Sequence, residues 1–229
     1  MGYFKMLNTH DLQVPMSNPA KVSQSTQAYN KIEEMIVTLK LSPGSSFTEG
    51  ELIDQTGLGR TPVREALQRL TAEKLVILIP RKGMMISSID IGEFLNLLQT
   101  RRVLDMLLAE QASRRANPDQ RIQIQHAADQ MHACITSGDV RGFLDWDYRL
   151  DQVIAEASRN SYAADAVSPL YTHCRRFWYY YQQNSDMTMV AEEHQNLARA
   201  IVSANAEEAR ESVNQLIQYW TTFAKSLLE

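Results

Sequence analysis

The first apolar pattern in the chain has helical spacing and follows a polar start. Residues 1–23 show no periodicity, and we expect them to form a mobile arm. From residue 28 onward, apolar side chains recur at three- and four-residue steps, which predicts a helix. Pro and Gly at positions 43 and 44 then break the pattern. The apolar face of this helix comprises Tyr29, Ile32, Ile36 and Leu39.

Two more short helices follow, with a tight turn between them. Thr48 and Glu51 have the spacing of a capping box, which predicts the start of a helix. The Gly-Leu-Gly run at 57–59 stops that helix within about two turns. Thr61 is suited to cap the next helix, and the proline after it is suited to the first helical position. We therefore expect a third helix over 62–73.

The pattern then changes from helical spacing to short apolar runs. Residues 75–79 and 84–86 are apolar and flank a Pro-Arg-Lys-Gly tip, which predicts a β-hairpin. Three helices, a glycine-containing turn before the third, and a hairpin are the order of a winged helix-turn-helix. We place this domain at residues 24–88.

The rest of the chain, residues 89–229, has helical spacing throughout and no strand pattern. We therefore predict a mainly α protein, in which the winged helix-turn-helix is followed by an all-α helical-bundle domain. The Ser168-Pro169 pair can split the fourth helix of this second domain. The predicted helices are 91–115, 118–136, 140–158, 161–183, 187–204 and 206–228.

Charge changes this picture when it is counted by segment. The 229 residues have a formal net charge of -4. Residues 1–88 hold 10 Lys and Arg against 8 Asp and Glu, whereas residues 89–229 hold 13 against 19. This asymmetry indicates nucleic-acid contact by the first half. No apolar run approaches the ~18 residues of a membrane helix, and we expect a cytoplasmic protein without a membrane partner.

The third predicted helix has polar and basic residues opposite its apolar stripe. Recognition helices contact base edges with residues near their N-terminal end, and arginine can donate to both O6 and N7 of guanine. The basic hairpin tip can reach a phosphate or the minor groove. Alternatively, these charges form a solvated helix surface and an ordinary turn. The residues predicted to contact DNA are Arg60, Thr61, Arg64, Gln68, Arg81 and Lys82.

Polar residues also interrupt the apolar faces of three helices in the second domain. Arg101 and Asp105 lie in the core stripe of the first helix. Asp147 and Asp151 share one face of the third helix, and His194 is centred on the apolar stripe of the fifth. Buried charges are costly unless they are paired or bound to a ligand or metal. We therefore expect a central site of the kind that helical bundles build.

Each of these residues also has a simpler interpretation. Arg101 can pair with Asp105 four residues later, His194 can be a hydrogen-bonded core histidine, and either aspartate of the third helix can be a hydrated surface carboxylate. The aromatic and basic run at 171–181 can stack on nucleic acid. We favour packing of this run in a core or dimer interface, with some side chains lining the pocket.

Three stretches of the first domain resemble the DNA-binding domain of GntR-type transcription regulators. They are Gly59-Arg60-Thr61-Pro62-Val63-Arg64-Glu65-Ala66-Leu67-Gln68-Arg69-Leu70, Glu73-Lys74-Leu75-Val76 and Pro80-Arg81-Lys82-Gly83. The second domain resembles the FadR-like branch, which carries an FCD effector domain. The resemblance covers about residues 25–225.

This resemblance implies a homodimer that binds near-palindromic, double-stranded operator DNA. It also implies operator contacts by Arg60, Thr61, Arg64 and Gly83 of the hairpin. Gly50 departs from the pattern, because some relatives have a basic residue there that contacts DNA.

The resemblance also implies a ligand set for the central pocket. Many FCD domains hold a divalent metal ion with one Asp and three His. Asp147 and His194 match two of these ligands, Asp151 stands in place of the first His, and Leu216 replaces the last. Two carboxylates and one histidine can still hold a hard or borderline divalent ion, so Asp147, Asp151 and His194 are the candidate metal ligands. Arg101 matches a family arginine that engages an effector carboxylate.

The leading hypothesis is therefore a sequence-specific DNA-binding regulator that acts as a repressor. A small-molecule effector, such as a carboxylate-bearing metabolite, would bind at Arg101, Asp147, Asp151 and His194 and change operator affinity. One alternative is a metal-dependent enzyme that activates water in this pocket, although the sequence has no Ser-His-Asp, phosphate-loop or zincin motif. Another is a constitutive repressor without an effector. We expect dimerisation through the helical domain.

Overall fold

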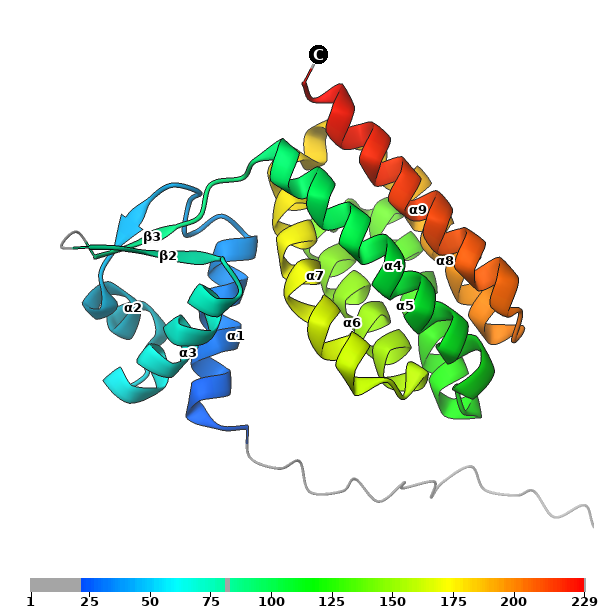
Figure 1. The fold of residues 1–229 in the computed structure, drawn as a ribbon, viewed down its shortest axis with the longest axis horizontal. Coiled ribbons are helices and arrows are strands. Elements are labelled where there is room, and N and C mark those ends of the chain that lie inside the picture. Colours follow the sequence, from blue (N-terminus) through cyan, green and yellow to red (C-terminus); the bar gives the residue numbers. More distant parts are fainter. Residues whose placement is uncertain (1–21, 81–82, 229) are drawn as a thin grey trace, which may run out of the picture.

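The computed structural model describes residues 22–80 and 83–228, and these are mostly helical (Figure 1). The predicted arm at 1–23 lies outside the described residues except for its last two. Among the described residues, no helix is both long enough and apolar enough to cross a membrane. The first unit contains α1 (Gln24–Val37), β1 (Ser46–Phe47), α2 (Glu49–Thr56), α3 (Arg60–Ala72), β2 (Val76–Ile79) and β3 (Gly83–Ile86).

Local sequence signals set the ends of the first two helices. The Ser23 side chain accepts a hydrogen bond of 3.1 Å from the backbone N–H of Thr26, so α1 begins before the apolar periodicity does. The capping box at α2 is confirmed, with Thr48 and Glu51 each bonding the other's backbone N–H. Gly57 then ends α2 in the left-handed conformation, at φ 67°, which glycine adopts without steric cost.

The third helix starts earlier than predicted. Its N-cap is Gly59, which makes no side-chain capping bond, so the prediction of Thr61 as N-cap is wrong. Pro62 fits inside the first turn, because backbone N–H groups there have no intrahelical partner to lose. Arg60 and Thr61 therefore belong to the exposed N-terminal turn of α3.

The predicted hairpin is present, and a third strand extends it. β2 and β3 pair antiparallel, with Val76 opposite Ile86, and β1 pairs with the other edge of β3. At two residues, β1 is too short to show the alternation that identifies a strand in sequence. Fully buried residues from α1, α2, α3 and β3 form the core beneath this sheet, including Ile32, Leu52, Leu70 and Ile86.

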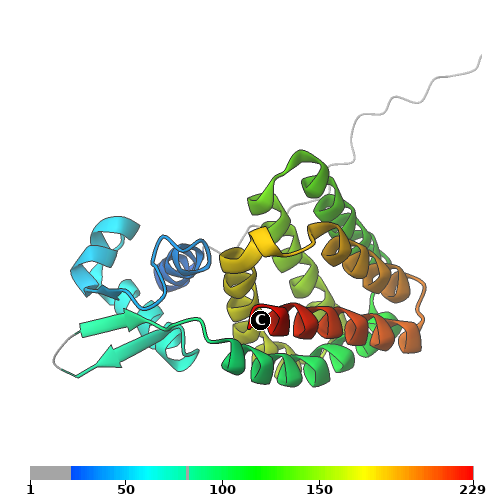
Figure 2. The ribbon, with the colours of Figure 1, turned by 90° about the horizontal axis from the view of Figure 1, so that it is seen from above.

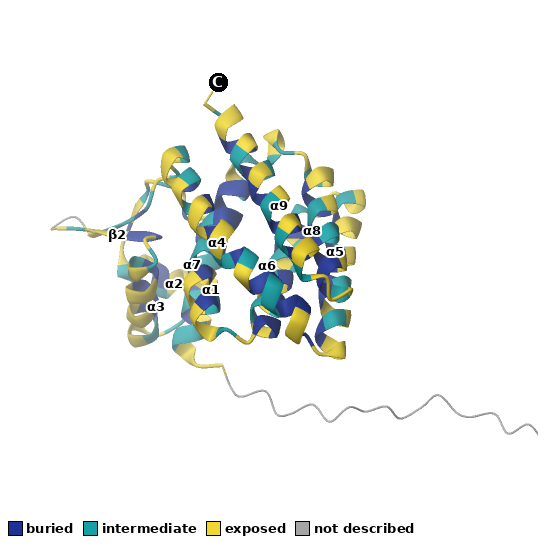
Figure 3. Cartoon of the chain, turned by 45° about the vertical axis from the view of Figure 1, so that its right-hand side comes forward, coloured by how far each residue is buried: buried dark blue, intermediate teal, exposed yellow. Residues whose placement is uncertain are grey.

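The second unit is a bundle of helices with its own larger apolar core (Figure 2). It contains α4 (Ile91–Arg115), α5 (Pro118–Ser137), α6 (Val140–Ser158), α7 (Ser161–Tyr181), α8 (Met187–Val202) and α9 (Ala206–Ser226), with a short 3-10 turn at Gln182–Asn184. The inner faces of these helices are buried and their outer faces are exposed (Figure 3).

Two details of the bundle bear on the predictions. The predicted core stripe of α4 is confirmed, because Phe94, Leu98, Arg101 and Asp105 are all buried. By contrast, the prediction that Pro169 splits the fourth helix is wrong, since α7 runs through it. Burial of the residues on either side outweighs the one backbone hydrogen bond that the proline removes.

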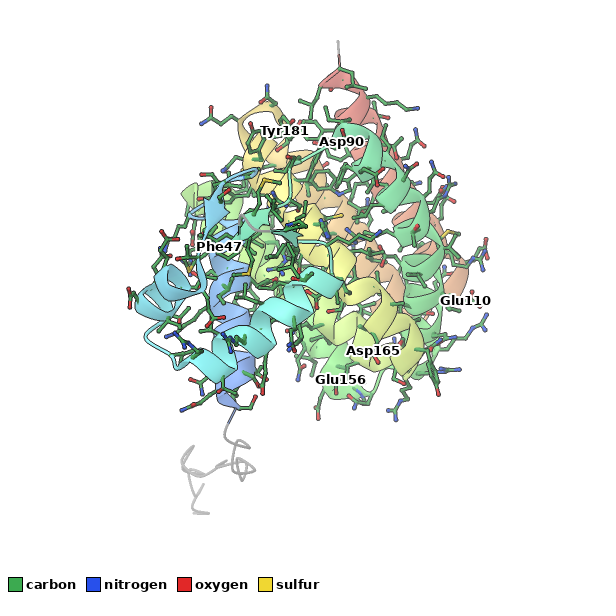
Figure 4. The ribbon with its side chains drawn as sticks, turned by 60° about the vertical axis from the view of Figure 1, so that its left-hand side comes forward. Phe47, Asp90, Glu110, Glu156, Asp165 and Tyr181 are labelled. Carbon is green, nitrogen blue, oxygen red and sulfur yellow. The ribbon has the colours of Figure 1, made fainter. Side chains whose placement is uncertain are left out.

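The two units lie side by side, with α1 against α7 (Figures 1 and 2). A four-residue connection leads from Ile86 at the end of β3 to Ile91 at the start of α4. Figure 4 marks Phe47 on the small sheet and Asp90, the N-cap residue where the chain enters α4. The helical unit therefore contacts the first unit through both a packed helix pair and a short tether.

A matched pair of isoleucines on α5 tests the packing of the helical core. Ile124 is fully buried, whereas Ile122 is 68% exposed on the same helix. We expect Ile124→Ala to lower the free energy of unfolding by about 2–5 kcal/mol, because it leaves a cavity. Ile122→Ala should stay within about 0.5 kcal/mol of the wild type. Urea unfolding followed by circular dichroism measures both, and equal effects would contradict the burial assigned to α5.

Candidate DNA-reading surface and ligand cavity

The N-terminal end of α3 has two exposed arginines that share one carboxylate. The side chains of Arg60 and Arg64 are 71% and 60% exposed. Glu49, the first residue of α2, accepts from Arg64 Nε at 2.6 Å and lies 3.2 Å from Arg60 Nε. Glu49 thus positions both guanidinium groups and offsets part of their charge. The sequence analysis did not identify this role, because Glu49 lies on a different helix.

The other candidate DNA contacts surround this pair. Thr61 and Gln68 are exposed on α3, while the apolar stripe of that helix faces the core. Gly83 opens β3 at φ 98°, a value that side-chain-bearing residues rarely adopt. Arg81 and Lys82 lie outside the described residues. The exposed face of α3 is therefore polar and basic where a recognition helix meets base edges.

A small cavity lies at the centre of the helical unit, with a volume of about 20 Å³. That is room for about one water molecule. Helices α4, α6, α7, α8 and α9 all contribute to its walls. Arg101, Asp147 and His194 from the predicted site line it, and so does Leu216. Asp151 does not line this cavity.

Arg101 is held by Asp105, four residues later on α4. Its Nε and Nη2 atoms each lie 2.8 Å from Asp105 Oδ2. The hydroxyl of Tyr171 donates to Asp105 Oδ1 at 2.9 Å. Burial raises the pKa of Asp105, and the contacts with Arg101 and Tyr171 oppose that rise. The simpler interpretation of Arg101 as one half of an ion pair is confirmed.

His194 and Asp147 form a second internal pair. His194 Nε2 lies 3.1 Å from Asp147 Oδ1, and Nδ1 is 2.7 Å from the carbonyl oxygen of Val190. Burial lowers the pKa of His194, but Asp147 more than reverses this and raises it. Burial likewise favours a high pKa for Asp147, yet His194 brings it below its usual value. Both shifts in pKa favour the ionised form of each partner.

The described donors do not fit a metal centre. Leu216, whose side chain cannot bind a metal, lines the cavity where the family's last histidine would be. Asp151 does not line the cavity with Asp147 and His194, so the three candidate ligands do not converge on it. Across residues 22–80 and 83–228, no group of three His, Cys, Asp or Glu residues is placed to hold a metal ion.

Two family models match the chain, one for each structural unit. The FCD domain model matches residues 96–219, more than half of the chain. The model for bacterial regulatory proteins of the gntR family matches residues 24–86. The chain belongs to the GntR family, in the branch with an FCD domain. This GntR protein is a DNA-binding transcription regulator and not an enzyme, so the enzyme alternative is wrong.

Individual relatives agree with this assignment. The GntR protein is 44% identical to an uncharacterized HTH-type transcriptional regulator of Streptomyces ambofaciens over 62 residues, which are 27% of this chain and about a quarter (26%) of that protein. It is 21% identical over 193 residues to the transcriptional repressor RspR of Escherichia coli, covering 84% of this chain and 85% of RspR. The solved structure of E. coli McbR/YncC has the same fold, with a TM-score of 0.80 at 18% identity, covering 91% of this chain and 100% of that one.

The sequence analysis missed the contacts between the two units of this GntR regulator. Several of them come from the aromatic and basic run of α7, most of which packs in the core as we favoured. Arg175 donates to Glu33 of α1, and Arg176 donates to the side chain and carbonyl of Ser87 in the connection to α4. His173 Nε2 lies 2.8 Å from the carbonyl oxygen of Glu73. Two adjacent arginines in a run that packs in the core were the available signal.

Removing one partner of the Arg101–Asp105 pair tests its role. We expect Asp105→Asn to lower the free energy of unfolding by about 3–5 kcal/mol, because it leaves a buried guanidinium uncompensated. Glu110→Gln should cost far less, because its two partners, Arg114 and Arg210, are largely open to solvent. Replacing both partners with Arg101→Met and Asp105→Leu should restore most of the loss. Chemical unfolding provides the comparison, and a double variant as unstable as Asp105→Asn would contradict the pairing.

Proposed function

We propose that this GntR regulator represses transcription by binding a near-palindromic operator as a homodimer, and that a carboxylate-bearing small molecule in its helical domain changes operator affinity. Residues 24–88 would contact the operator in the cytoplasm, and residues 89–229 would bind the effector and the second protomer. The exposed arginine pair at the N-terminus of α3 is the observation that carries the DNA-binding part. Repression is supported by the name of RspR, a transcriptional repressor.

Operator contact by α3 follows from its exposed chemistry. Arg60 and Arg64 are within reach of a guanine edge or a phosphate once α3 enters the major groove. Thr61 and Gln68 add hydrogen-bonding groups on the same exposed surface. Arg81, Lys82 and Gly83 of the hairpin would contact the adjacent backbone. Glu49 holds both arginines before DNA arrives, which reduces the side-chain entropy lost on binding.

Exposed apolar side chains on the helical domain support dimerisation through it. Val103 is 70% exposed and Leu107 is 38% exposed. They are four residues apart and therefore share one face of α4. Such a face is suited to a second copy of the same surface in a two-fold dimer.

The cations at the central cavity support an anionic effector. Arg101 and His194 line it, with Asp147 beside them and Asp151 on the same helix as Asp147. At about 20 Å³ the cavity is too small for such a molecule, so an effector must widen it and select a different arrangement of the helices. A coupling of about 1–3 kcal/mol between effector and operator would change operator affinity about 5–150-fold.

Loss of one arginine from α3 tests the DNA-binding surface. We expect Arg64→Ala to weaken operator binding by about 1–3 kcal/mol, or about 5–150-fold, through loss of a base or phosphate contact. The operator is the best sequence that the wild-type protein selects from random duplexes, and fluorescence anisotropy at fixed salt measures affinity.

The matched control for Arg64→Ala is Arg114→Ala. It removes a comparably exposed arginine, 64% exposed, from the C-terminal end of α4. Its affinity should stay near that of the wild type, because the C-terminal end of α4 lies away from α3 in the fold (Figure 1). Equal losses in both variants would indicate a general charge effect and contradict the placement of α3 on the operator.

A further inference from the structure

Two arginines and one histidine line the central cavity, and each pairs with a carboxylate inside the protein. Arg101 pairs with Asp105 of α4, and His194 pairs with Asp147 of α6. Arg175 of α7 pairs with Glu33. The first two carboxylates belong to the helical domain itself, whereas Glu33 lies on α1 of the DNA-binding domain. The third pair therefore connects the wall of the cavity to the DNA-binding domain.

The Arg175–Glu33 contact is largely closed to water. Its side chains are only 9% and 13% exposed. Glu33 Oε1 also accepts a hydrogen bond of 2.8 Å from the hydroxyl of Thr172, one turn earlier on α7. The Arg175 guanidinium lies over the ring of Tyr148, with 4.3 Å from Cζ to the ring centroid. The low dielectric of this site strengthens the Arg175–Glu33 ion pair. That stabilisation is lost once another group displaces Glu33 from Arg175.

Arg175 has hydrogen-bonding capacity that Glu33 does not use. Its Nε is buried and has no hydrogen-bond partner among the described residues. A guanidinium has five N–H donors in a planar fork, and two of its nitrogens can donate to one carboxylate in a bidentate arrangement. A ligand carboxylate entering the cavity can satisfy Nε and a terminal nitrogen together, which the Glu33 contact does not.

We infer that Arg175 is a ligand-binding residue of the cavity, and that a ligand carboxylate takes the place of Glu33 on its guanidinium. The exchange releases Glu33 and breaks the buried ion pair that holds α1 against α7. This inference rests on the proposed function, because the exchange is the route by which an effector in the helical domain moves the DNA-binding domain. The exchange requires a small effector with at least one carboxylate group that is free to face Arg175.

A neighbouring ion pair between the same two domains provides a control. Arg141 of α6 pairs with Glu34, the residue after Glu33, but their side chains are 60% and 44% exposed. Neither residue lines the central cavity. Glu34→Gln therefore removes a carboxylate from the same helix and the same domain contact without touching the site of the exchange.

The test measures carboxylate binding to the full-length protein and its variants. Acetate, succinate and citrate are titrated at constant ionic strength against sodium chloride, with tryptophan fluorescence as the signal, since Trp178 and Trp220 line the cavity. Operator affinity is measured in parallel at each carboxylate concentration. We expect Glu33→Gln to bind the best carboxylate about 5–150-fold more tightly than the wild type, because the internal competitor is gone.

The remaining variants separate binding from stability. Glu34→Gln should match the wild type. Arg175→Met should lose carboxylate binding, but it leaves Glu33 buried without its partner. The double variant with Glu33→Gln and Arg175→Met removes both charges, so it keeps the test valid if the single variant does not fold. Arg175→Lys should bind more weakly than the wild type, because an ammonium lacks the planar fork.

The outcomes distinguish this inference from the function on which it rests. The exchange is overturned if Glu33→Gln binds carboxylate no more tightly than the wild type does. It is also overturned if the double variant still binds carboxylate. Operator binding by the wild type without carboxylate binding in any variant also overturns it but leaves the DNA-binding function intact. Failure of the wild type to bind any selected operator is a failure of the proposed function itself. Tighter carboxylate binding by Glu33→Gln with altered operator affinity supports the exchange.

Discussion

Compensation of buried positive charge is the constraint on which the centre of this regulator depends. Burying a guanidinium or imidazolium away from water has a desolvation free energy of several kcal/mol, which must be offset by a carboxylate packed against it. Arg175 and His194 meet this requirement with carboxylates on other helices. Arg101 meets it with Asp105 on its own helix, and Tyr171 of α7 bonds to that carboxylate. The helices that carry these partners must keep their relative positions, so the pairs help to define how α4, α6, α7 and α8 pack and where α1 rests.

The same principle has a milder form at the surface of the DNA-binding domain. Glu49 pairs with Arg60 and Arg64 while leaving both of them mostly exposed to solvent. Exposed ion pairs contribute little to stability and are screened by salt. They can therefore open when phosphates compete for the arginines, at little energetic cost. A buried pair fixes architecture, whereas this exposed one holds a binding surface ready.

Periodicity and capping residues predicted most of the fold, and tertiary contacts decided the rest. The spacing of apolar residues placed the helices of both domains, and the core stripe of α4 was predicted residue by residue. Thr61 and Pro169 were misjudged because a local preference was outweighed by the backbone at Gly59 and by burial along α7. Arg101, Asp147 and His194 could be assigned to one cavity, since each interrupts an apolar face. The pairing of Arg175 with Glu33 could not be predicted, because Glu33 lies more than a hundred residues earlier and no pattern links them.

The short connection between β3 and α4 has a kinetic consequence. Four residues can span at most about 14 Å even when fully extended. Arg176 of α7 also donates hydrogen bonds to Ser87, the first of these four residues. If the DNA-binding domain separates from the bundle, the connection therefore keeps it at an effective concentration of about millimolar or higher near the bundle. Recapture is intramolecular, so the resting arrangement returns quickly and independently of how many copies of the protein the cell contains.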